Sequence, residues 1–344
     1  MLPRGRPPSA PRPERHGGLG DHGSRRACVV ASERHPLRCA VRATRLRGLP
    51  PSACRDPADS DGLVSADTGP DLPRLTVALT FDHDAISDSV RRGDPPVKLS
   101  HAEFGPRVGV PRSCELLERE RIPATWFVPG HSSQTFPASI ELILRGDSEL
   151  ACHGWFHEDF STIPADEQRR ILHRSIEEVV RLTGRPPKGF RAPYWALGSE
   201  TLDLVADAGF VYDSSLMADD YRLYRVRRGD RHSVEHGTSF GREGPLIEVP
   251  VYWAMDDWPH FEPGTGKDGL STPSQVLEIW LGELRYAYDH APGGLVMVTM
   301  HPECIGRGHR MAMLERFIGE AKGLDGLVFA RLEAVVERFQ PGSS

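Results

Sequence analysis

The sequence predicts an α/β protein built as a distorted (β/α) barrel that is closed or nearly closed. From Leu75 onward, strand-like and helix-like segments alternate about seven times along the chain. This order favours a parallel sheet with helices packed outside it. Polar motifs follow the ends of several predicted strands, and barrel enzymes gather their chemistry at the carboxyl ends of strands.

The strands are predicted from short runs of apolar, β-branched or aromatic residues that stop at a turn residue. The first strand covers 75–81 and ends at Asp82. The others are expected at 124–128, 149–152, 189–191, 210–212, 246–249, 295–300 and 328–330. Residues 213–245 fit the alternation poorly and are interpreted as a long insertion.

The helices are predicted from apolar residues at helical spacing, with Pro near their starts and Gly just after their ends. The clearest one covers 164–183, and Gly184 ends it. Thr272 is the expected N-cap of a long helix, with Pro273 as its first residue. Further helices are expected at 111–121, 137–145, 199–208, 311–321 and 332–339.

The chain is predicted to divide into a disordered Arg/Pro/Ala-rich tail, residues 1–71, and a barrel domain, residues 72–341. The first 70 residues contain no Phe, Trp or Tyr and carry a net charge of +5, which leaves −11 for the rest. Such a segment cannot bury enough apolar area to offset the entropy of ordering it. A targeting peptide and a nucleic-acid-binding arm are alternatives, but the composition favours a dispensable tail.

The overall composition excludes several classes of protein. The 344 residues are 39% hydrophobic and contain no apolar run of about 18 residues, so no membrane span is expected. The net charge of −6 argues against a nucleic-acid partner. The tail lacks the apolar region of a secretory signal, and Cys114, Cys152 and Cys304 are expected to be reduced thiols. We therefore expect a cytoplasmic protein.

Two carboxylates follow the first strand in the sequence Asp82-His83-Asp84. Alternation along a strand places Asp82 and Asp84 on one face and His83 on the other. One acid can then ligate a metal while the other takes a proton from water. Taken alone, the motif is better interpreted as a polar turn after a strand.

A histidine pair follows the third strand in the sequence His153-Gly-Trp-Phe-His157. Histidines at positions i and i+4 point together if the segment turns helically, although a pair of surface histidines would show the same spacing. Two imidazoles and the carboxylate of Asp84 leave open positions on a metal, which a catalytic metal needs. The sequence therefore predicts a metal held by Asp84, His153 and His157.

Three further motifs follow later strands. Arg191 and Tyr194 belong to the sequence Arg-Ala-Pro-Tyr-Trp; Arg191 could hold Asp82 ionised, and the Tyr194 N–H could face an oxyanion. Asp257 lies among aromatic residues, which suggests a pocket wall. His301 follows the apolar strand 295–300 and is placed as a general acid, with Asp82 as the base. Substrate or oxyanion contacts are assigned to Arg191, Tyr194, Trp195, Trp155, Trp253 and Asp257.

Five motifs, read in order, resemble those of the polysaccharide deacetylase (NodB-homology) family: TFDHDA, HGWFHE, RAPYW, VPVYWAMDDWP and VTMHP. The family's usual first motif is TFDDG, whereas this chain has His83 between its two acids. In this it is similar to the branch of peptidoglycan-deacetylase-like proteins and cyclic imidases. The resemblance implies a NodB-type barrel with one divalent metal per chain. Zinc is the metal expected first, with Co, Ni and Mn as alternatives. The resemblance also implies a homo-oligomer, namely a tetramer.

Two enzymatic functions share this mechanism. The first is N-deacetylation of an N-acetylated sugar, and the second is hydrolysis of a small cyclic imide or amide, as in imidases and allantoinases. The tryptophans suit either sugar stacking or an enclosed apolar pocket. A third hypothesis, an inactive barrel used for binding, is disfavoured because the acids, the histidine pair and His301 are all present.

Overall fold

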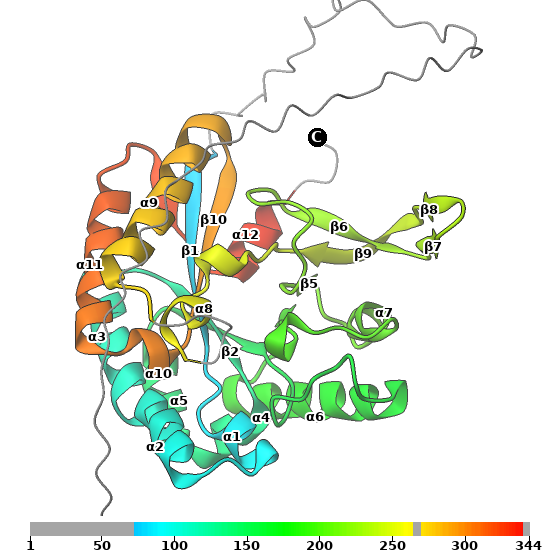
Figure 1. Ribbon diagram of the computed structural model, residues 1–344, viewed down its shortest axis with the longest axis horizontal. Coiled ribbons are helices and arrows are strands. Elements are labelled where there is room, and N and C mark those ends of the chain that lie inside the picture. The colour runs from blue at the N-terminus through cyan, green and yellow to red at the C-terminus, as the bar shows by residue number, and fades with distance from the viewer. Residues whose placement is uncertain (1–71, 264–269, 340–344) are drawn as a thin grey trace, which may run out of the picture. The chain divides into compact units, whose positions relative to one another are not determined.

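A computed structural model describes residues 72–263 and 270–339, and its centre is one curled sheet (Figure 1). Seven strands along the sheet pair side by side in parallel, and the first six, in order, are β10, β1, β2, β3, β4 and β5, followed by β9. Their bounds are Leu75–Asp82 (β1), Ala124–Val128 (β2), Ser148–Cys152 (β3), Gly189–Phe190 (β4), Tyr212–Asp213 (β5) and Gly294–Met300 (β10). The parallel β/α architecture predicted from the sequence is confirmed.

The sheet curls into a distorted barrel that does not close completely. Beyond β5 it continues through β9 (Arg242–Glu248) to the antiparallel strand β6 (Tyr224–Arg228). The barrel would close between β9 and β10, at opposite ends of the parallel set. Among the described residues no strand pairing joins them there, and an isolated parallel β-bridge links Asp256 to Thr299. This bridge matters for the site, because it fixes the segment after β9 beside the end of β10.

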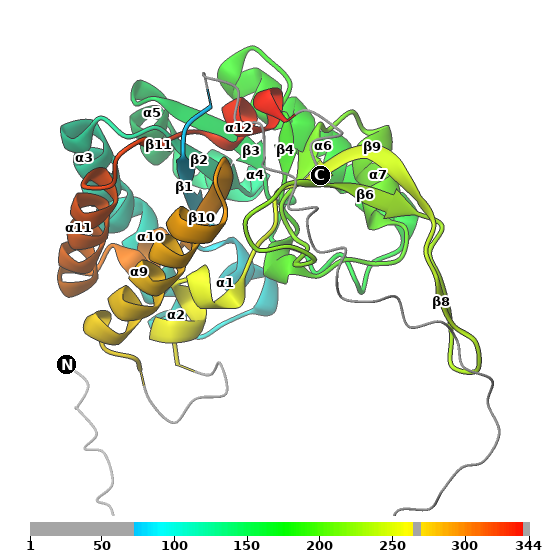
Figure 2. The same cartoon turned by 90° about the horizontal axis from the view of Figure 1, so that it is seen from above.

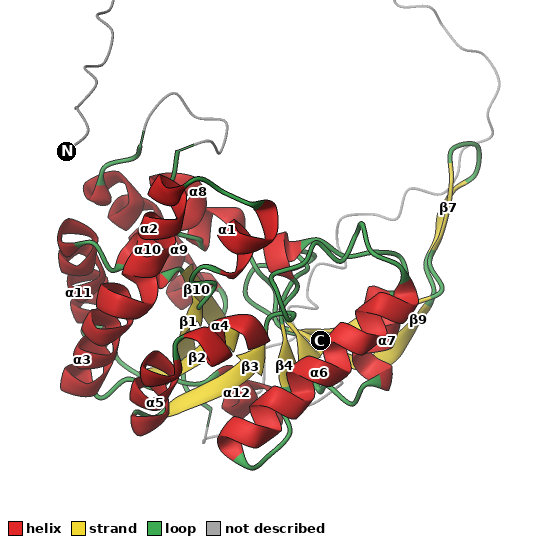
Figure 3. Ribbon diagram, turned by 90° about the horizontal axis from the view of Figure 1, so that it is seen from below, coloured by secondary structure: helices red, strands yellow, loops and turns green. Residues whose placement is uncertain are grey.

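Helices cover the outside of the sheet. In the view of Figure 2, α3 (Val110–Glu120), α9 (Pro273–His290) and α11 (Gly308–Lys322) group beside β1 and β10. Figure 3 shows α6 (Ala165–Thr183) and α7 (Thr201–Asp207) side by side on another face. Helix α9 begins where the sequence predicts. Thr272 is its N-cap and Pro273 its first residue, and the side chains of Thr272 and Gln275 form a capping box.

Alternation along β1 separates two cores. Leu75, Val77, Leu79 and Phe81 belong to the larger core, which includes residues of the covering helices. Ala78 belongs to a smaller core with residues of the neighbouring strands and of the last helix, α12 (Leu332–Arg338). The short strand β11 (Leu327–Phe329) pairs with the start of β1 just before α12. The face of β1 that carries Ala78 also carries Thr80 and Asp82 by the same period of two.

Several elements were not predicted. They are α1 (Ser87–Arg92), α2 (Pro96–Phe104), a π-helical turn (Gly105–Gly109), α4 (Gly130–Thr135), α8 (Trp258–Phe261), α10 (Pro302–Ile305) and two 3₁₀ turns (Pro193–Trp195 and Trp253–Met255). By contrast, α5 (Pro137–Arg145) has the bounds expected for it. The strand expected at 210–212 begins only at Tyr212. Most of these are single turns at strand ends, too short to show an apolar period.

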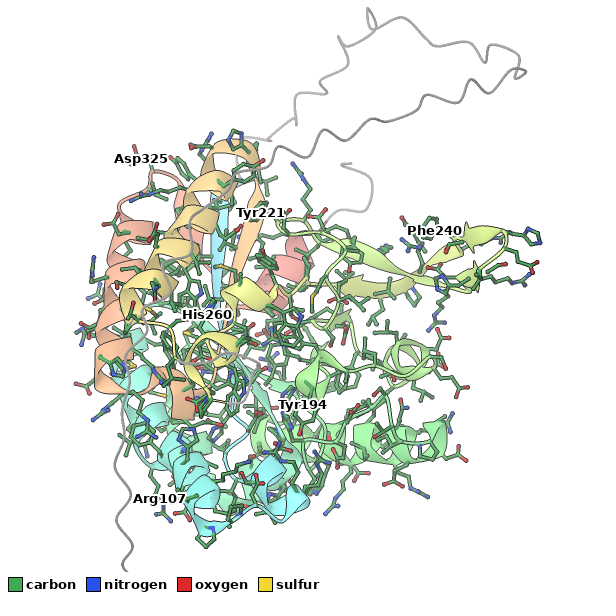
Figure 4. All side chains as sticks on the ribbon, viewed as in Figure 1. Arg107, Tyr194, Tyr221, Phe240, His260 and Asp325 are labelled. Atoms are coloured by element: carbon green, nitrogen blue, oxygen red, sulfur yellow. The ribbon has the colours of Figure 1, made fainter. Side chains whose placement is uncertain are left out.

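The segment interpreted as an insertion is an antiparallel ribbon. Strands β6 and β9 pair along its base, and β7 (Arg231–Ser233) pairs with β8 (Gly237–Ser239) at its tip. Figure 4 labels Phe240 on this ribbon, away from Tyr194. No helix in residues 72–263 and 270–339 is long and apolar enough to cross a membrane. The tail prediction, residues 1–71, lies outside the described residues.

Two buried acids lie opposite each other on the neighbouring strands β5 and β9. Asp213 on β5 and Glu248 on β9 are direct partners in the sheet register, and both are fully buried. Burial raises the pKa of Asp213 to about 6, and burial together with Asp213 raises the pKa of Glu248 well above its ordinary value. The folded protein therefore holds protons on this pair more tightly than the unfolded chain does.

This pair predicts a pH-dependent stability. Because both folded pKa values are raised, its contribution is complete below about pH 4 and declines as the pH rises through 6. Glu248→Gln should flatten the fall in melting temperature between pH 5 and pH 8, since a neutral amide can donate to Asp213. Glu243→Gln, an exposed change on the same strand, is the control. Equal slopes for the two variants would contradict the assignment.

Candidate metal centre

Three side chains converge at the carboxyl ends of β1 and β3. The Asp84 carboxylate lies 3.4 Å from His153 Nε2 through Oδ1, and 3.2 Å from His157 Nε2 through Oδ2. All three residues are buried, and one ligand atom from each lies within 4.8 Å of the others. The structure thus brings together the three residues that the sequence predicts as metal ligands.

The histidine pair converges by a different route from the one expected. Residues 153–157 form no helical turn; instead Gly154 and His157 both take left-handed backbone conformations, with φ of 68° and 56°. A side chain at Gly154 would meet the Glu158 carboxylate at 2.9 Å, so glycine is needed there for space as well as for φ. The loop turns back sharply enough to place both Nε2 atoms at Asp84.

The donor set fits a divalent metal. Asp84 Oδ1 is buried and has no hydrogen-bond partner. His153 Nδ1 lies 2.8 Å from the carbonyl oxygen of Arg191; as a donor to it, Nδ1 carries the proton and Nε2 offers its lone pair. Two imidazole nitrogens and one carboxylate are typical ligands of zinc-type catalytic sites with open positions.

The charge of the Asp84 carboxylate also fits. Burial by itself would raise the pKa of Asp84, but His157, His153 and His301 together outweigh burial and hold it below its ordinary value. Asp84 is therefore an anion at neutral pH, as a metal-ligating carboxylate must be. Burial lowers the pKa of His153, which keeps that imidazole neutral.

Asp82 lies beside this centre and is held by a buried arginine. Its Oδ1 accepts a 2.6 Å charged hydrogen bond from Arg191 Nη1, and its Oδ2 lies 3.8 Å from His153 Nε2. Arg191 is fully buried and also donates to Thr80 Oγ1 and to the Ser214 carbonyl. The ion pair expected between Arg191 and Asp82 is therefore present, and it fixes the Asp82 carboxylate at the metal centre.

His301 faces the centre from the end of β10. Its Nε2 lies 4.0 Å from Asp84 Oδ2, and its Nδ1 lies 2.8 Å from Asp257 Oδ1. Burial opposes protonation of this imidazole, but Asp256, Asp257 and Asp84 outweigh it and raise the pKa of His301 well above its ordinary value. His301 is therefore a protonated imidazole near neutral pH and can give up a proton.

The centre opens into a pocket of about 880 Å³. Asp82, Asp84, His153, His157 and His301 all line it. Three of the expected substrate contacts, Tyr194, Trp195 and Trp253, also line it. The rings of Trp195 and Trp253 lie against each other, with centroids 4.0 Å apart and planes tilted by 37°. Part of the remaining wall comes from α1, through Asp88 and Arg92, and from α2, through Val97, Lys98 and His101.

Backbone strain is concentrated around this pocket. Ala85, His157, Tyr194 and Trp195 all have φ between 47° and 58°, which non-glycine residues rarely adopt. Residues in this region cost of order 1–3 kcal/mol each and persist where the surroundings over-determine them, often at functional sites. Here the strain turns the chain so that these side chains lie at the metal centre and the pocket wall.

Three expected substrate contacts lie elsewhere and are corrected. The Trp155 ring is buried against Gly130, with the guanidinium carbon of Arg174 3.4 Å from its ring centroid, so it belongs to the core. Arg191 is covered by its bonds to Asp82 and to strand ends. Asp257 is fully buried behind His301 and binds its Nδ1 rather than forming a pocket wall. None of the three lines the pocket.

Other pocket residues were not predicted. Asp256, the neighbour of Asp257, lines the pocket in its place, and burial raises its pKa to about 7. Glu303 also lines it; its Oε2 is buried without a hydrogen-bond partner, and burial raises its pKa well above the ordinary value. Asp88 lies four residues after Asp84, a helical spacing that could have indicated it had α1 been recognised.

A barrel whose strand ends bring together three residues that could hold a metal, a second carboxylate and an imidazole has the groups that a metal-dependent hydrolase needs. Comparisons with known proteins identify the family. The family model described as polysaccharide deacetylase matches residues 70–212. The chain belongs to the polysaccharide deacetylase family, whose members are metal-dependent hydrolases of carbon–nitrogen bonds other than peptide bonds.

Two relatives match along most of their own length. A peptidoglycan deacetylase from Helicobacter pylori is 29% identical over 281 residues, which cover 77% of this chain and 96% of the relative. A peptidoglycan deacetylase-like protein from Gibberella zeae is 30% identical over 267 residues, covering 70% and 79%. The family resemblance predicted from the motifs is thereby confirmed.

Solved structures agree with this fold. A polysaccharide deacetylase structure from Mycobacterium smegmatis is 36% identical and covers 78% of this chain and 91% of its own, with a TM-score of 0.66. An allantoinase structure has the same TM-score at 22% identity, which shows a shared fold alone.

Proposed function

We propose that this chain removes acetyl groups from an N-acetylated sugar, with a divalent metal held by Asp84, His153 and His157. The observation that carries the proposal is the convergence of these three residues with Asp82 and His301 in one pocket. The peptidoglycan deacetylases among its relatives support the choice of substrate class.

A zinc-type ion at such a site polarises an amide carbonyl and makes a water more acidic. The chain's own groups supply the proton transfers. Asp82, held in place by its bond to Arg191, takes the proton of the attacking water. His301, held through Nδ1 by Asp257, gives its Nε2 proton to the leaving nitrogen as the carbon–nitrogen bond breaks. The backbone N–H of Tyr194 is proposed to face the oxyanion.

The adjacent rings of Trp195 and Trp253 are proposed to hold the sugar. Both line the pocket, and Trp253 is nearly half exposed at 47%. Aromatic faces bind the apolar faces of sugar rings, and this pair of rings presents such a surface in the pocket. Trp253→Ala should therefore raise KM several-fold and change kcat less, which steady-state kinetics on a chitooligosaccharide would measure.

Hydrolysis of a small cyclic imide is the second candidate. The observation that favours it is the Asp82-His83-Asp84 spacing, together with the α1–α2 wall that carries Val97 and Ala102 to one side of the pocket. A wall on that side of the pocket suits a compact ring better than a long polymer. The two candidates share every catalytic residue and differ only in the substrate.

A side-by-side hydrolysis screen decides between them. Metal-loaded and chelator-treated protein should be incubated with tri-N-acetylchitotriose, succinimide, hydantoin and allantoin. Release of acetate from the sugar by the loaded protein alone is the expected result. Opening of an imide ring without acetate release would move the assignment to the second candidate, and no turnover of any compound would refute both.

Three finer points belong to the same proposal. Zinc is the first choice of metal, although Co, Ni or Mn would suit this donor set. A homo-oligomer, and a cytoplasmic location, are proposed as well; the described cysteines Cys114, Cys152 and Cys304 are free thiols, which is compatible with a reducing compartment. Metal analysis of the purified protein and its mass in solution would test the first two.

A further inference from the structure

The two ring nitrogens of His157 face two different carboxylates of one chain segment. Nε2 lies 3.2 Å from Asp84 Oδ2, and Nδ1 lies 3.8 Å from Asp88 Oδ1. Asp84 and Asp88 are four residues apart, at the end of β1 and in the first turn of α1. One side chain of this segment thus faces the metal-binding nitrogen, and the other faces the opposite side of the ring.

The carboxylate of Asp88 is fixed by several donors. Its Oδ1 accepts hydrogen bonds from the Tyr194 hydroxyl and, at 2.8 Å, from Arg91 Nη2; Arg92 Nη2 lies 3.0 Å from Oδ2. Arg91 Nη2 also donates to the Tyr194 hydroxyl at 2.8 Å, and the Tyr194 ring lies edge-on to His157 with centroids 4.4 Å apart. The Asp88 side chain is only 16% exposed. These contacts therefore hold the Asp88 carboxylate in one position.

The two histidines differ on the side away from the metal centre. His153 Nδ1 has a neutral partner, the Arg191 carbonyl, at hydrogen-bond distance. His157 Nδ1 is buried and makes no hydrogen bond. When Nε2 of a neutral imidazole binds a metal, the proton must be on Nδ1, and that N–H then needs an acceptor. The carboxylate that faces it is Asp88.

We propose that Asp88 is a positioning residue for the metal: it accepts the Nδ1–H of His157, sets the ring's orientation and strengthens Nε2 as a ligand. This inference rests on the proposed metal centre and adds a residue to it. Carboxylate partners of this kind raise the basicity of the ligating imidazole, and their loss typically weakens metal binding about 10- to 100-fold. Through Tyr194 and Arg91, the same carboxylate connects the metal centre to the pocket rim.

The test measures metal binding without any substrate. Metal-free protein is titrated with Zn²⁺ or Co²⁺ against a chromogenic chelator, for the unchanged chain and for Asp88→Ala, Asp88→Asn and Asp94→Asn. Asp94 is the matched control, because it also pairs with Arg92, at 2.9 Å, and lies 3.7 Å from Lys98 but has no contact with His157. Asp88→Ala should raise the dissociation constant about 10- to 100-fold, Asp88→Asn less, and Asp94→Asn less than about threefold.

The visible spectrum of bound Co²⁺ separates positioning from general loss of structure. If Asp88 orients His157, Asp88→Ala should change the intensity or position of the Co²⁺ bands at saturating metal, whereas Asp94→Asn should leave them unchanged. The melting temperature of each metal-free variant shows whether the fold is intact. If Asp88→Ala fails to fold, the metal titration and the Co²⁺ spectrum of Asp88→Asn decide the question.

His157→Ala keeps this inference distinguishable from the proposed function. If His157→Ala loses the metal while both Asp88 variants bind it as the unchanged chain does, with the same Co²⁺ bands, Asp88 has no positioning role and the proposed metal centre stands. If His157→Ala binds the metal normally, the metal centre itself is wrong, and the inference about Asp88 is overturned with it.

Discussion

Asp82→Asn is expected to lower kcat by about 10²- to 10⁴-fold while leaving the metal bound, since the amide cannot take a proton from water. Asp84→Asn is expected to lose activity for a different reason, because a neutral amide oxygen replaces the anionic ligand and metal affinity falls. Single-turnover kinetics and metal analysis on both variants measure the two effects. Metal loss in Asp82→Asn, with retention in Asp84→Asn, would exchange the two roles.

Stability must be measured alongside activity in this comparison. Asp82 is the ion-pair partner of the fully buried Arg191, and removing one partner of a buried pair typically costs about 3–5 kcal/mol. Asparagine keeps an oxygen that can accept from Arg191, so the cost should be smaller for Asp82→Asn than for Asp82→Ala. A kcat that recovers at lower temperature would trace the loss to unfolding and not to proton transfer.

Replacement of both His153 and His157 by alanine is expected to abolish specific metal binding and all hydrolysis. The purified protein should otherwise hold about one divalent ion per chain, and a chelator should remove both ion and activity. Elemental analysis of the double variant is the measurement. His131→Ala serves as a control, because His131 lies in α4, bonds Ser87 and does not line the pocket. Full occupancy in the double variant would refute the site.

The parts of the site that the sequence predicts well are those governed by regular structure. Asp82 and Asp84 follow a strand whose alternation fixes which face each takes, and His301 follows another. The histidine pair was found through its spacing, although a left-handed turn brings it together and a helix does not. In each case a local pattern determines where the side chain lies.

The residues assigned wrongly lie where the backbone is irregular. After β9 the chain passes through a 3₁₀ turn, Trp253–Met255, so no period indicates whether Asp256 or Asp257 faces the pocket. Trp155 lies in a loop where Gly130, from another strand end, leaves room for its ring. Asp88 is a different case: it lies in the helix α1 and received no assignment, because its partner Tyr194 is 106 residues away and no local pattern relates the two.

The order in which the barrel is assembled has consequences for its biogenesis. β1 pairs with β10 and β11, which follow it by more than 200 residues. The last helix, α12, supplies apolar side chains to the smaller core, to which Ala78 of β1 belongs. During synthesis β1 therefore leaves the ribosome long before its partners, with one edge unpaired and Ala78 uncovered. Non-local pairing of this kind slows folding and exposes nascent chains to aggregation. A chain shortened before β10 should accumulate in an aggregated form or bound to chaperones, and not as a partly active enzyme.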